Sequence, residues 1–164
     1  MSRIQRSTRR WEALPLRCNV LLIITDPETG EEVERIVAHN IVVSVGKTLV
    51  ARMLADESGY DTGLKFIEIG TGSNPATVGD TGLQTGTARS AVSDPPLRTA
   101  NVIQFRAFFA AADCTALIKE VGLFGHSTAT ATLGTGILFN RAIVTFNNVA
   151  GTKDLTVVVA ITVG

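Results

Sequence analysis

Hydrophobic and polar residues alternate along much of this chain with the period of two that is typical of β-strands. Apolar side chains alternate or cluster, and β-strands are therefore predicted, over Leu16–Thr25, Glu31–Val37, Leu64–Ile69, Asn101–Ala111, Leu117–Phe124, Ile137–Phe146 and Leu155–Val163. The turn residues of Asp26–Gly30 separate the first two segments, which should form a hairpin. In the final segment, the residues expected to face the core are Leu155, Val157, Val159, Ile161 and Val163.

One segment has the period of an α-helix instead. It follows the β-branched run Asn40–Val43, and the apolar residues on one side of it are Val45, Leu49, Val50, Met53 and Leu54. Ser44 is placed as the N-cap residue, and Gly59 lies near the expected end of the helix. Gly70–Thr99 is rich in Gly, Thr, Ser, Asp and Pro and shows little periodicity, so we predict a long loop there. Loops of this length are usually functional or ordered only in an assembly.

Together these elements predict a mainly β protein, an antiparallel β-sandwich of about seven or eight strands with one α-helix. A jelly-roll arrangement is one option, and the strand order stays open. Residues 1–13 are polar and rich in arginine, and are interpreted as an extended basic arm on a single β-sandwich domain of residues 14–164.

The composition limits the classes of partner that the protein is expected to bind. Of 164 residues, 45% are hydrophobic and 18% charged, and fifteen basic residues balance fifteen acidic ones. This balance predicts neither a nucleic-acid nor a membrane partner. We expect no secretory signal, because no apolar stretch follows the basic residues before Pro15. Cys18 and Cys114 lack the spacing of a metal site and are interpreted as reduced thiols packed in the core, although their oxidation stays open.

The arm is the candidate partner-binding segment. Its candidate residues are Arg3, Arg6, Arg9, Arg10 and Trp11. The guanidinium groups could form bidentate bonds to carboxylates of another protein, and the body of the chain does not continue the basic stripe that DNA binding would need. Trp11 either packs on its own domain or anchors in a neighbour's pocket.

Two glycine motifs are weak candidates for nucleotide binding. Gly46-Lys47-Thr48 resembles the end of a phosphate-binding loop, but Ile41 stands where the motif requires its first glycine. Lys47 is therefore interpreted as a solvated residue in the first helical turn. Gly70-Thr71-Gly72 lacks the third glycine of a dinucleotide fingerprint and is interpreted as a turn or a glycine-rich crossing.

No group of catalytic residue types stands out. His39 and His126 are placed in separate loops without a second ligand nearby. Glu68 and Glu120 lie inside strands, where a carboxylate pair would suggest a glycosidase, but nothing in the sequence brings them together. Lys119-Glu120 is expected to form a cross-strand or interface ion pair. We expect no catalytic activity, no cofactor and no bound metal.

Several short motifs follow one another in an order that is more specific than any one of them. They are Asn40–Lys47, Phe66–Gly72, Asp80–Leu83, Ala88-Arg89, Lys119–Phe124 and Ile161–Val163. Their order resembles that in the N-terminal domain of phage tail-collar fibre proteins and related short virion proteins of tailed bacteriophages. The resemblance runs from about Asn40 to the C-terminus, and the segment up to Ala38 lies outside it.

The resemblance implies a non-enzymatic virion structural protein, assembled in the host cytoplasm. The expected role is a tail, fibre-attachment or adaptor component, and the expected partners are other virion proteins of the tail, baseplate or capsid. Self-assembly is also expected, with a trimer implied by the family. One alternative is a capsid decoration protein that staples major capsid subunits. Another is a β-sandwich that binds or hydrolyses carbohydrate of the host envelope.

Overall fold

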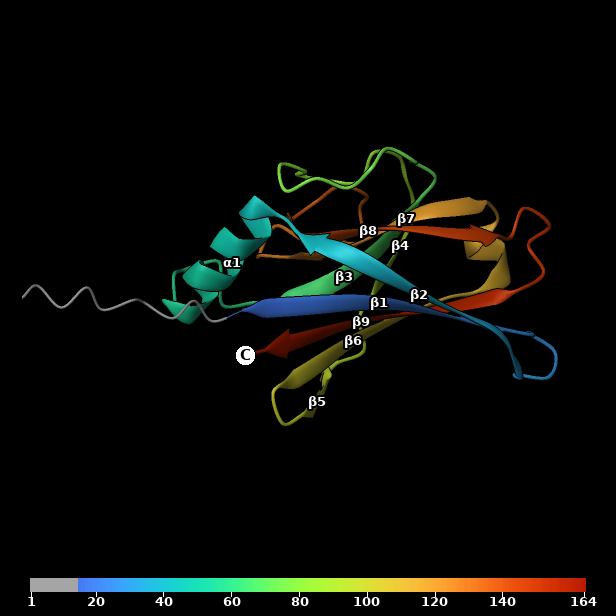
Figure 1. Cartoon of the computed structure of the whole chain (residues 1–164), viewed down its shortest axis with the longest axis horizontal. Coiled ribbons are helices and arrows are strands. Elements are labelled where there is room, and N and C mark those ends of the chain that lie inside the picture. Colours follow the sequence, from blue (N-terminus) through green and yellow to red (C-terminus); the bar gives the residue numbers. More distant parts are fainter. Residues whose placement is uncertain (1–14) are drawn as a thin grey trace, which may run out of the picture.

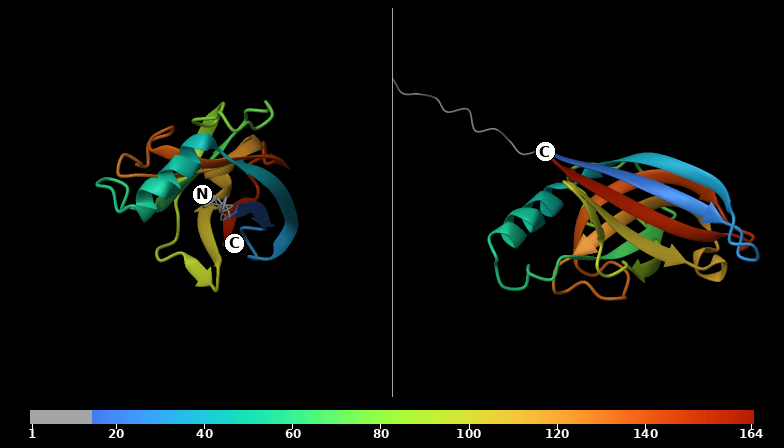
Figure 2. Two further views of the ribbon diagram at one scale, coloured as in Figure 1. Left: turned by 60° about the vertical axis from the view of Figure 1, so that its left-hand side comes forward. Right: turned by 90° about the horizontal axis from the view of Figure 1, so that it is seen from below.

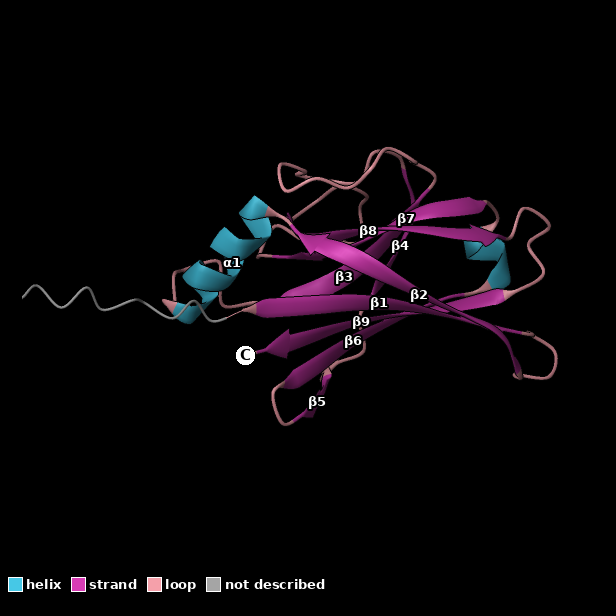
Figure 3. Cartoon of the chain, viewed as in Figure 1, coloured by secondary structure: helices cyan, strands magenta, loops and turns pink. Residues whose placement is uncertain are grey.

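The computed structural model describes residues 15–164, which form nine strands, one α-helix and a short 3-10 helix (Figure 1). The elements are β1 (Leu16–Thr25), β2 (Glu32–Val42), α1 (Ser44–Leu54), β3 (Leu64–Gly70), β4 (Gly86–Ala91), β5 (Leu97–Thr99), β6 (Val102–Phe109), η1 (Ala111–Cys114), β7 (Leu117–Gly125), β8 (Ile137–Asn147) and β9 (Asp154–Val163). Figure 3 shows how strongly strands dominate this part of the chain. The expected class, mainly antiparallel β with one α-helix, is confirmed.

The strands form one continuous antiparallel sheet in the order β4-β3-β7-β8-β2-β1-β9-β6-β5. The sheet folds back on itself at β2, which pairs with β1 over residues 32–39 and with β8 over residues 40–42. The two halves therefore face each other as layers, and α1 lies at one end of them (Figure 2).

The hydrophobic core lies between these two layers, and the pattern of alternation accounts for it. In β9, Leu155, Val157 and Val159 are fully buried and Ile161 nearly so, as predicted, whereas Val163 is only partly buried. Facing them from the other layer are buried residues of β3, β7 and β8, including Ile67. Complete burial of such side chains is worth about 1.5–3 kcal/mol each, so the facing layers supply most of the driving force for folding.

The first hairpin also forms as predicted. β1 and β2 pair in antiparallel register, and Asp26 begins the turn between them. The Asp26 carboxylate accepts the backbone N–H of Glu28 at 2.9 Å and binds the Lys153 ammonium at 3.0 Å. The first of these bonds is the larger cause, and together they hold the pKa of Asp26 below its usual value.

Four details of the sequence prediction are wrong. The predicted loop Gly70–Thr99 contains two strands, β4 and β5, because small polar residues can pair at a sheet edge without alternating. His39 lies in β2 rather than in a loop. Ser44, predicted as the N-cap, is instead the first residue of α1, and Val43 is the N-cap. The Val43 N–H donates to the Phe139 carbonyl, so the strand pairing continues up to the residue before the helix. Leu54 was expected on the buried side of α1 but is 81% exposed, because no residue in the described part of the chain covers the end of the helix.

Candidate functional site

The five residues predicted to bind a partner fall outside residues 15–164. They are Arg3, Arg6, Arg9, Arg10 and Trp11. The structure does describe the point from which this segment departs. The Pro15 carbonyl accepts a hydrogen bond from the Gly164 N–H at 3.0 Å, which continues the pairing of β1 with β9.

Glu120, on β7, is the centre of a buried hydrogen-bond network. Its side chain is fully buried. One carboxylate oxygen accepts the backbone N–H groups of Gly72 at 3.0 Å and Thr85 at 2.7 Å. The other accepts the Gln84 N–H and the Arg141 Nε–H, each at 2.9 Å. One carboxylate thereby holds both ends of the loop between β3 and β4.

Arg141, on β8, extends this network to the middle of the same loop. Its guanidinium donates to Asp80 Oδ2 at 2.9 Å and to the Asn74 carbonyl at 3.2 Å. Burial alone would raise the pKa of Asp80. The Thr77 N–H, the Arg141 guanidinium and the Thr77 hydroxyl outweigh that effect and hold this pKa below its usual value.

A second ion pair, between Glu68 and Arg89, links neighbouring strands β3 and β4. The two groups are 2.7 Å apart and their side chains are almost completely buried. Glu68 also accepts the Gly134 N–H at 2.9 Å, and Arg89 donates to the Thr135 carbonyl at 2.7 Å. The Arg89 guanidinium carbon lies 4.5 Å from the centre of the Phe124 ring, a cation–π contact. This pair holds the loop between β7 and β8 against the sheet.

Both carboxylates lie on the same face of the sheet, because Glu68 pairs with Gly122 and Gly70 pairs with Glu120 across β3 and β7. Each is bound to its own arginine and to backbone N–H groups, which is the geometry of structural ion pairs. A cross-strand or interface ion pair was predicted for Lys119-Glu120. Glu120 forms one with Arg141 of β8, whereas Lys119 forms no ion pair within residues 15–164. Sequence reasoning missed this arginine, although a charged residue inside the apolar segment Ile137–Phe146 is itself a signal that a partner is needed.

The two glycine motifs are explained by close packing. A Cβ at Gly46 would overlap the backbone of Phe139, so α1 can approach β8 only with glycine there. A Cβ at Gly72 would lie 2.5 Å from a Glu120 carboxylate oxygen. Lys47 is exposed in the first turn of α1, as predicted.

His126 and the two cysteines each have a defined environment. His126 contacts the edge of the Tyr60 ring, with ring centres 4.5 Å apart, and its Nδ1 lies 2.8 Å from the Thr128 hydroxyl. Both cysteines are free, and burial raises the pKa of the Cys18 thiol to about 11. Among the described residues, no three His, Cys, Asp or Glu side chains form a group that could hold a metal ion.

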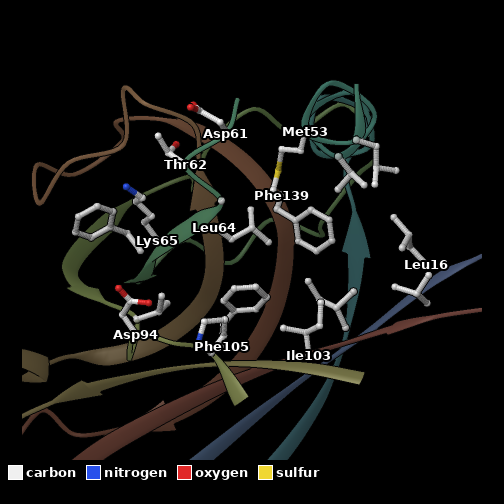
Figure 4. A pocket seen from close by; sticks show the side chains of 18 of the residues that line it. Leu16, Met53, Asp61, Thr62, Leu64, Lys65, Asp94, Ile103, Phe105 and Phe139 are labelled. Atoms are coloured by element: carbon white, nitrogen blue, oxygen red, sulfur yellow. The ribbon is translucent and has the colours of Figure 1, made fainter. Parts of the chain in front are cut away.

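The described part of the chain contains an apolar groove, shown in Figure 4. It opens between α1, the β3–β4 edge and β6, and has a volume of about 1040 Å³. Its interior is lined by apolar side chains, including Leu64, Phe105, Phe139 and Ile161. We call this hollow the apolar groove. Its size is at the upper end of the range for ligand pockets.

The rim of the apolar groove carries a few polar groups and one exposed apolar side chain. Asp61, Lys65 and Asp94 line it, as does Lys47 of α1. The exposed Leu54 stands at the same rim. The groove therefore combines an apolar floor with charges of both signs at its edge. No sequence signal could have revealed it, since residues of seven elements that are distant in sequence line it.

Comparison with protein-family models, curated proteins and solved structures finds no match. No helix within residues 15–164 has the length and apolar character needed to cross a membrane.

Proposed function

We propose that this chain is a non-enzymatic structural protein of a tailed-bacteriophage particle, where it serves as a tail, fibre-attachment or adaptor component. The observation that carries the proposal is where the residues of the resembling motifs lie. Glu68, Gly72, Asp80, Arg89 and Glu120 come from four separate motifs. All five take part in the two buried ion-pair networks.

This coincidence supports the resemblance for a physical reason. The motif residues whose order along the chain resembles that of the phage proteins are also the residues that hold two loops on one face of the sheet. A buried ion pair that lost one partner would cost about 3–5 kcal/mol, so such residues are constrained as a set. The motifs therefore describe a scaffold for surface loops, which suits a protein that works by contact with other proteins.

The surface supports an assembly role as well. Several large apolar side chains are more than half exposed in the described part of the chain, among them Val37, Leu54 and Phe108. Together with the apolar groove, they leave surface that neighbouring subunits could cover. Other virion proteins and further copies of this chain, with a trimer as the expected form, are the proposed partners.

Quantitative mass spectrometry of purified phage particles tests the proposal. Tens of copies or fewer per particle are expected for a tail component. Hundreds of copies would favour the capsid decoration alternative, in which the arginine arm staples capsid subunits. If the protein is missing from intact particles, or if the pure protein hydrolyses host-envelope polysaccharide, the proposal is wrong.

Deletion of Met1–Arg10 tests the arm. The deleted segment is mostly polar, so the melting temperature should stay nearly unchanged, while occupancy on particles should fall because the guanidinium contacts are lost. A matched variant that replaces Arg3, Arg6, Arg9 and Arg10 by glutamine keeps the length and should lose occupancy to a similar degree. Truncated protein that joins particles as well as the full chain would contradict this role.

A further inference from the structure

The apolar groove is larger than the core of a folded protein normally leaves open. Val50 and Met53 of α1 and Val92 beyond β4 are only partly buried along its sides. Apolar surface of this extent costs free energy in water unless something covers it. A compact apolar segment of a partner would cover this surface.

The chain itself contains such a segment. Leu16, the first residue of β1, lines the groove, and the segment precedes it closely in the sequence. It includes Trp11, the only tryptophan of the chain, and the apolar pair Ala13-Leu14. Tryptophan is the residue most enriched among side chains that dominate binding energy when they fill a pocket.

The direction of the chain disfavours return into the same groove. Leu16 pairs with Val163, and the Gly164 N–H bonds to the Pro15 carbonyl, so the backbone continues in line with β1 up to Pro15. Proline restricts the residue before it to extended backbone. Residues 11–14 contain no glycine or asparagine that would favour a reversal.

We propose that the apolar groove of one copy binds the segment Trp11–Leu14 of a second copy of this chain. This inference rests on the self-assembly in the proposed function and names the surface that carries it. Trp11 fills the groove beside Val50, Met53 and Ile103, which are only partly buried, and Leu14 covers the exposed Leu54 at the rim. Each copy thus donates one segment and accepts another.

Charges at the two surfaces match this arrangement. The segment that reaches the groove reads Arg9-Arg10-Trp11-Glu12, with both signs next to the tryptophan. The rim presents Asp61 and Asp94, neither of which forms an ion pair within residues 15–164, and lysines at 47 and 65. The arginines bind the aspartates, and Glu12 binds a lysine. Such donor-to-acceptor contacts are heterologous, and they close into a ring when the rotation allows, which accommodates the expected trimer.

Trp11 fluorescence tests the inference directly, because these 164 residues contain no other tryptophan. The emission should be blue-shifted at high protein concentration and should move to the red on dilution. Ala51→Arg places a charged side chain at the mouth of the groove from an exposed position of α1, and should give red-shifted emission at every concentration. Thr48→Arg, exposed on another side of the same helix, is the matched control and should behave as the wild type.

A mixing experiment identifies the donor and the acceptor. The Ala51→Arg protein keeps Trp11 but has a blocked groove, whereas the Trp11→Ala protein has an open groove and no tryptophan. Neither alone should show buried tryptophan, and the mixture should show a blue shift that saturates. Loss of Trp11 from both partners should weaken association about 30-fold or more, as for an interface hot spot. Thermal melts establish that each variant is folded, and Val50→Lys replaces Ala51→Arg if the latter is not.

Four results of the fluorescence experiments overturn the inference. The first is red-shifted emission of the wild type at all concentrations, and the second is a blue shift that persists in the Ala51→Arg protein. The third is an emission spectrum that does not change when the two variants are mixed. The fourth is a blue shift that does not depend on concentration but is abolished by Ala51→Arg. The last result would mean that the groove holds its own chain's segment. A small apolar molecule that co-purifies in the wild-type groove and leaves Trp11 exposed would overturn it too. If mixing fails while the protein is still found on particles, the inference alone is wrong, whereas absence from particles is a failure of the proposed function.

Discussion

Replacing Glu120 by glutamine should destabilise the protein by about 3 kcal/mol. The substitution preserves size but removes the charge that faces Arg141, whose side chain is only 3% exposed. Loss of one partner of a buried ion pair typically costs about 3–5 kcal/mol. The lower end applies because Asp80 still faces Arg141, and because the amide oxygen of glutamine can accept one of the bonds that the carboxylate accepted.

Urea denaturation at neutral pH measures this change, and a thermal melt should show a fall of roughly 6–12 °C for a chain of this length. Glu34→Gln is the matched control, because Glu34 lies exposed on β2. Its effect should stay within about 0.5 kcal/mol. Hydrogen exchange adds a local measurement. The amides of Gly72, Gln84 and Thr85 should exchange faster in the Glu120 variant, since they donate to that carboxylate.

A double variant, Glu120→Met with Arg141→Leu, tests the reasoning more sharply. Buried ion pairs can often be replaced by apolar residues without loss. Here the exchange should still destabilise, because three backbone N–H groups lose their acceptor and each unsatisfied group costs about 1–3 kcal/mol. A double variant as stable as the wild type, or a Glu120→Gln variant that loses less than about 1 kcal/mol, would refute the proposed role of this carboxylate.

Two further predictions concern other elements. Gly46→Ala should destabilise the protein by about 2 kcal/mol or more in thermal melts, although alanine has the better helix propensity, because the new Cβ overlaps the backbone of Phe139. Gly82→Ala is the control and should be near neutral, because a Cβ at Gly82 meets only open space. Asp26→Asn should lower stability at neutral pH, and the gap to the wild type should shrink as pH falls below about 4. A carboxyl group with a lowered pKa in the folded state stabilises the protein at pH values above its unfolded pKa, and this stabilisation is lost as the group is protonated. A difference in stability between wild type and variant that stays constant from pH 7 to pH 2 would contradict this account.

Strands with clear alternation could be predicted closely from the sequence. The bounds of β1 agree with the predicted segment Leu16–Thr25, and β9 begins only one residue earlier than predicted. β4 could not be predicted, because Gly86–Ala91 shows no apolar alternation and is stabilised by pairing with β3. Pairing of this kind is a long-range property that local composition does not report.

The candidate site was harder to predict for the same reason. Glu68 and Glu120 stood out as charges within strands, but their partners Arg89 and Arg141 are brought to them by the strand order. That order was open from the sequence. The apolar groove depends on the same topology.

The position of β9 has a consequence for how the chain folds. β9 is the last strand in sequence, yet it lies between β1 and β6, and Leu16 pairs with Val163. Contacts between residues so far apart slow folding, because a large loop must close before they form. Until β9 is in place, β1 and β6 each present an open edge that can pair with another chain. Newly made protein is therefore most prone to aggregation just before β9 joins the sheet, and conditions that protect open strand edges at that stage should raise the yield of native protein.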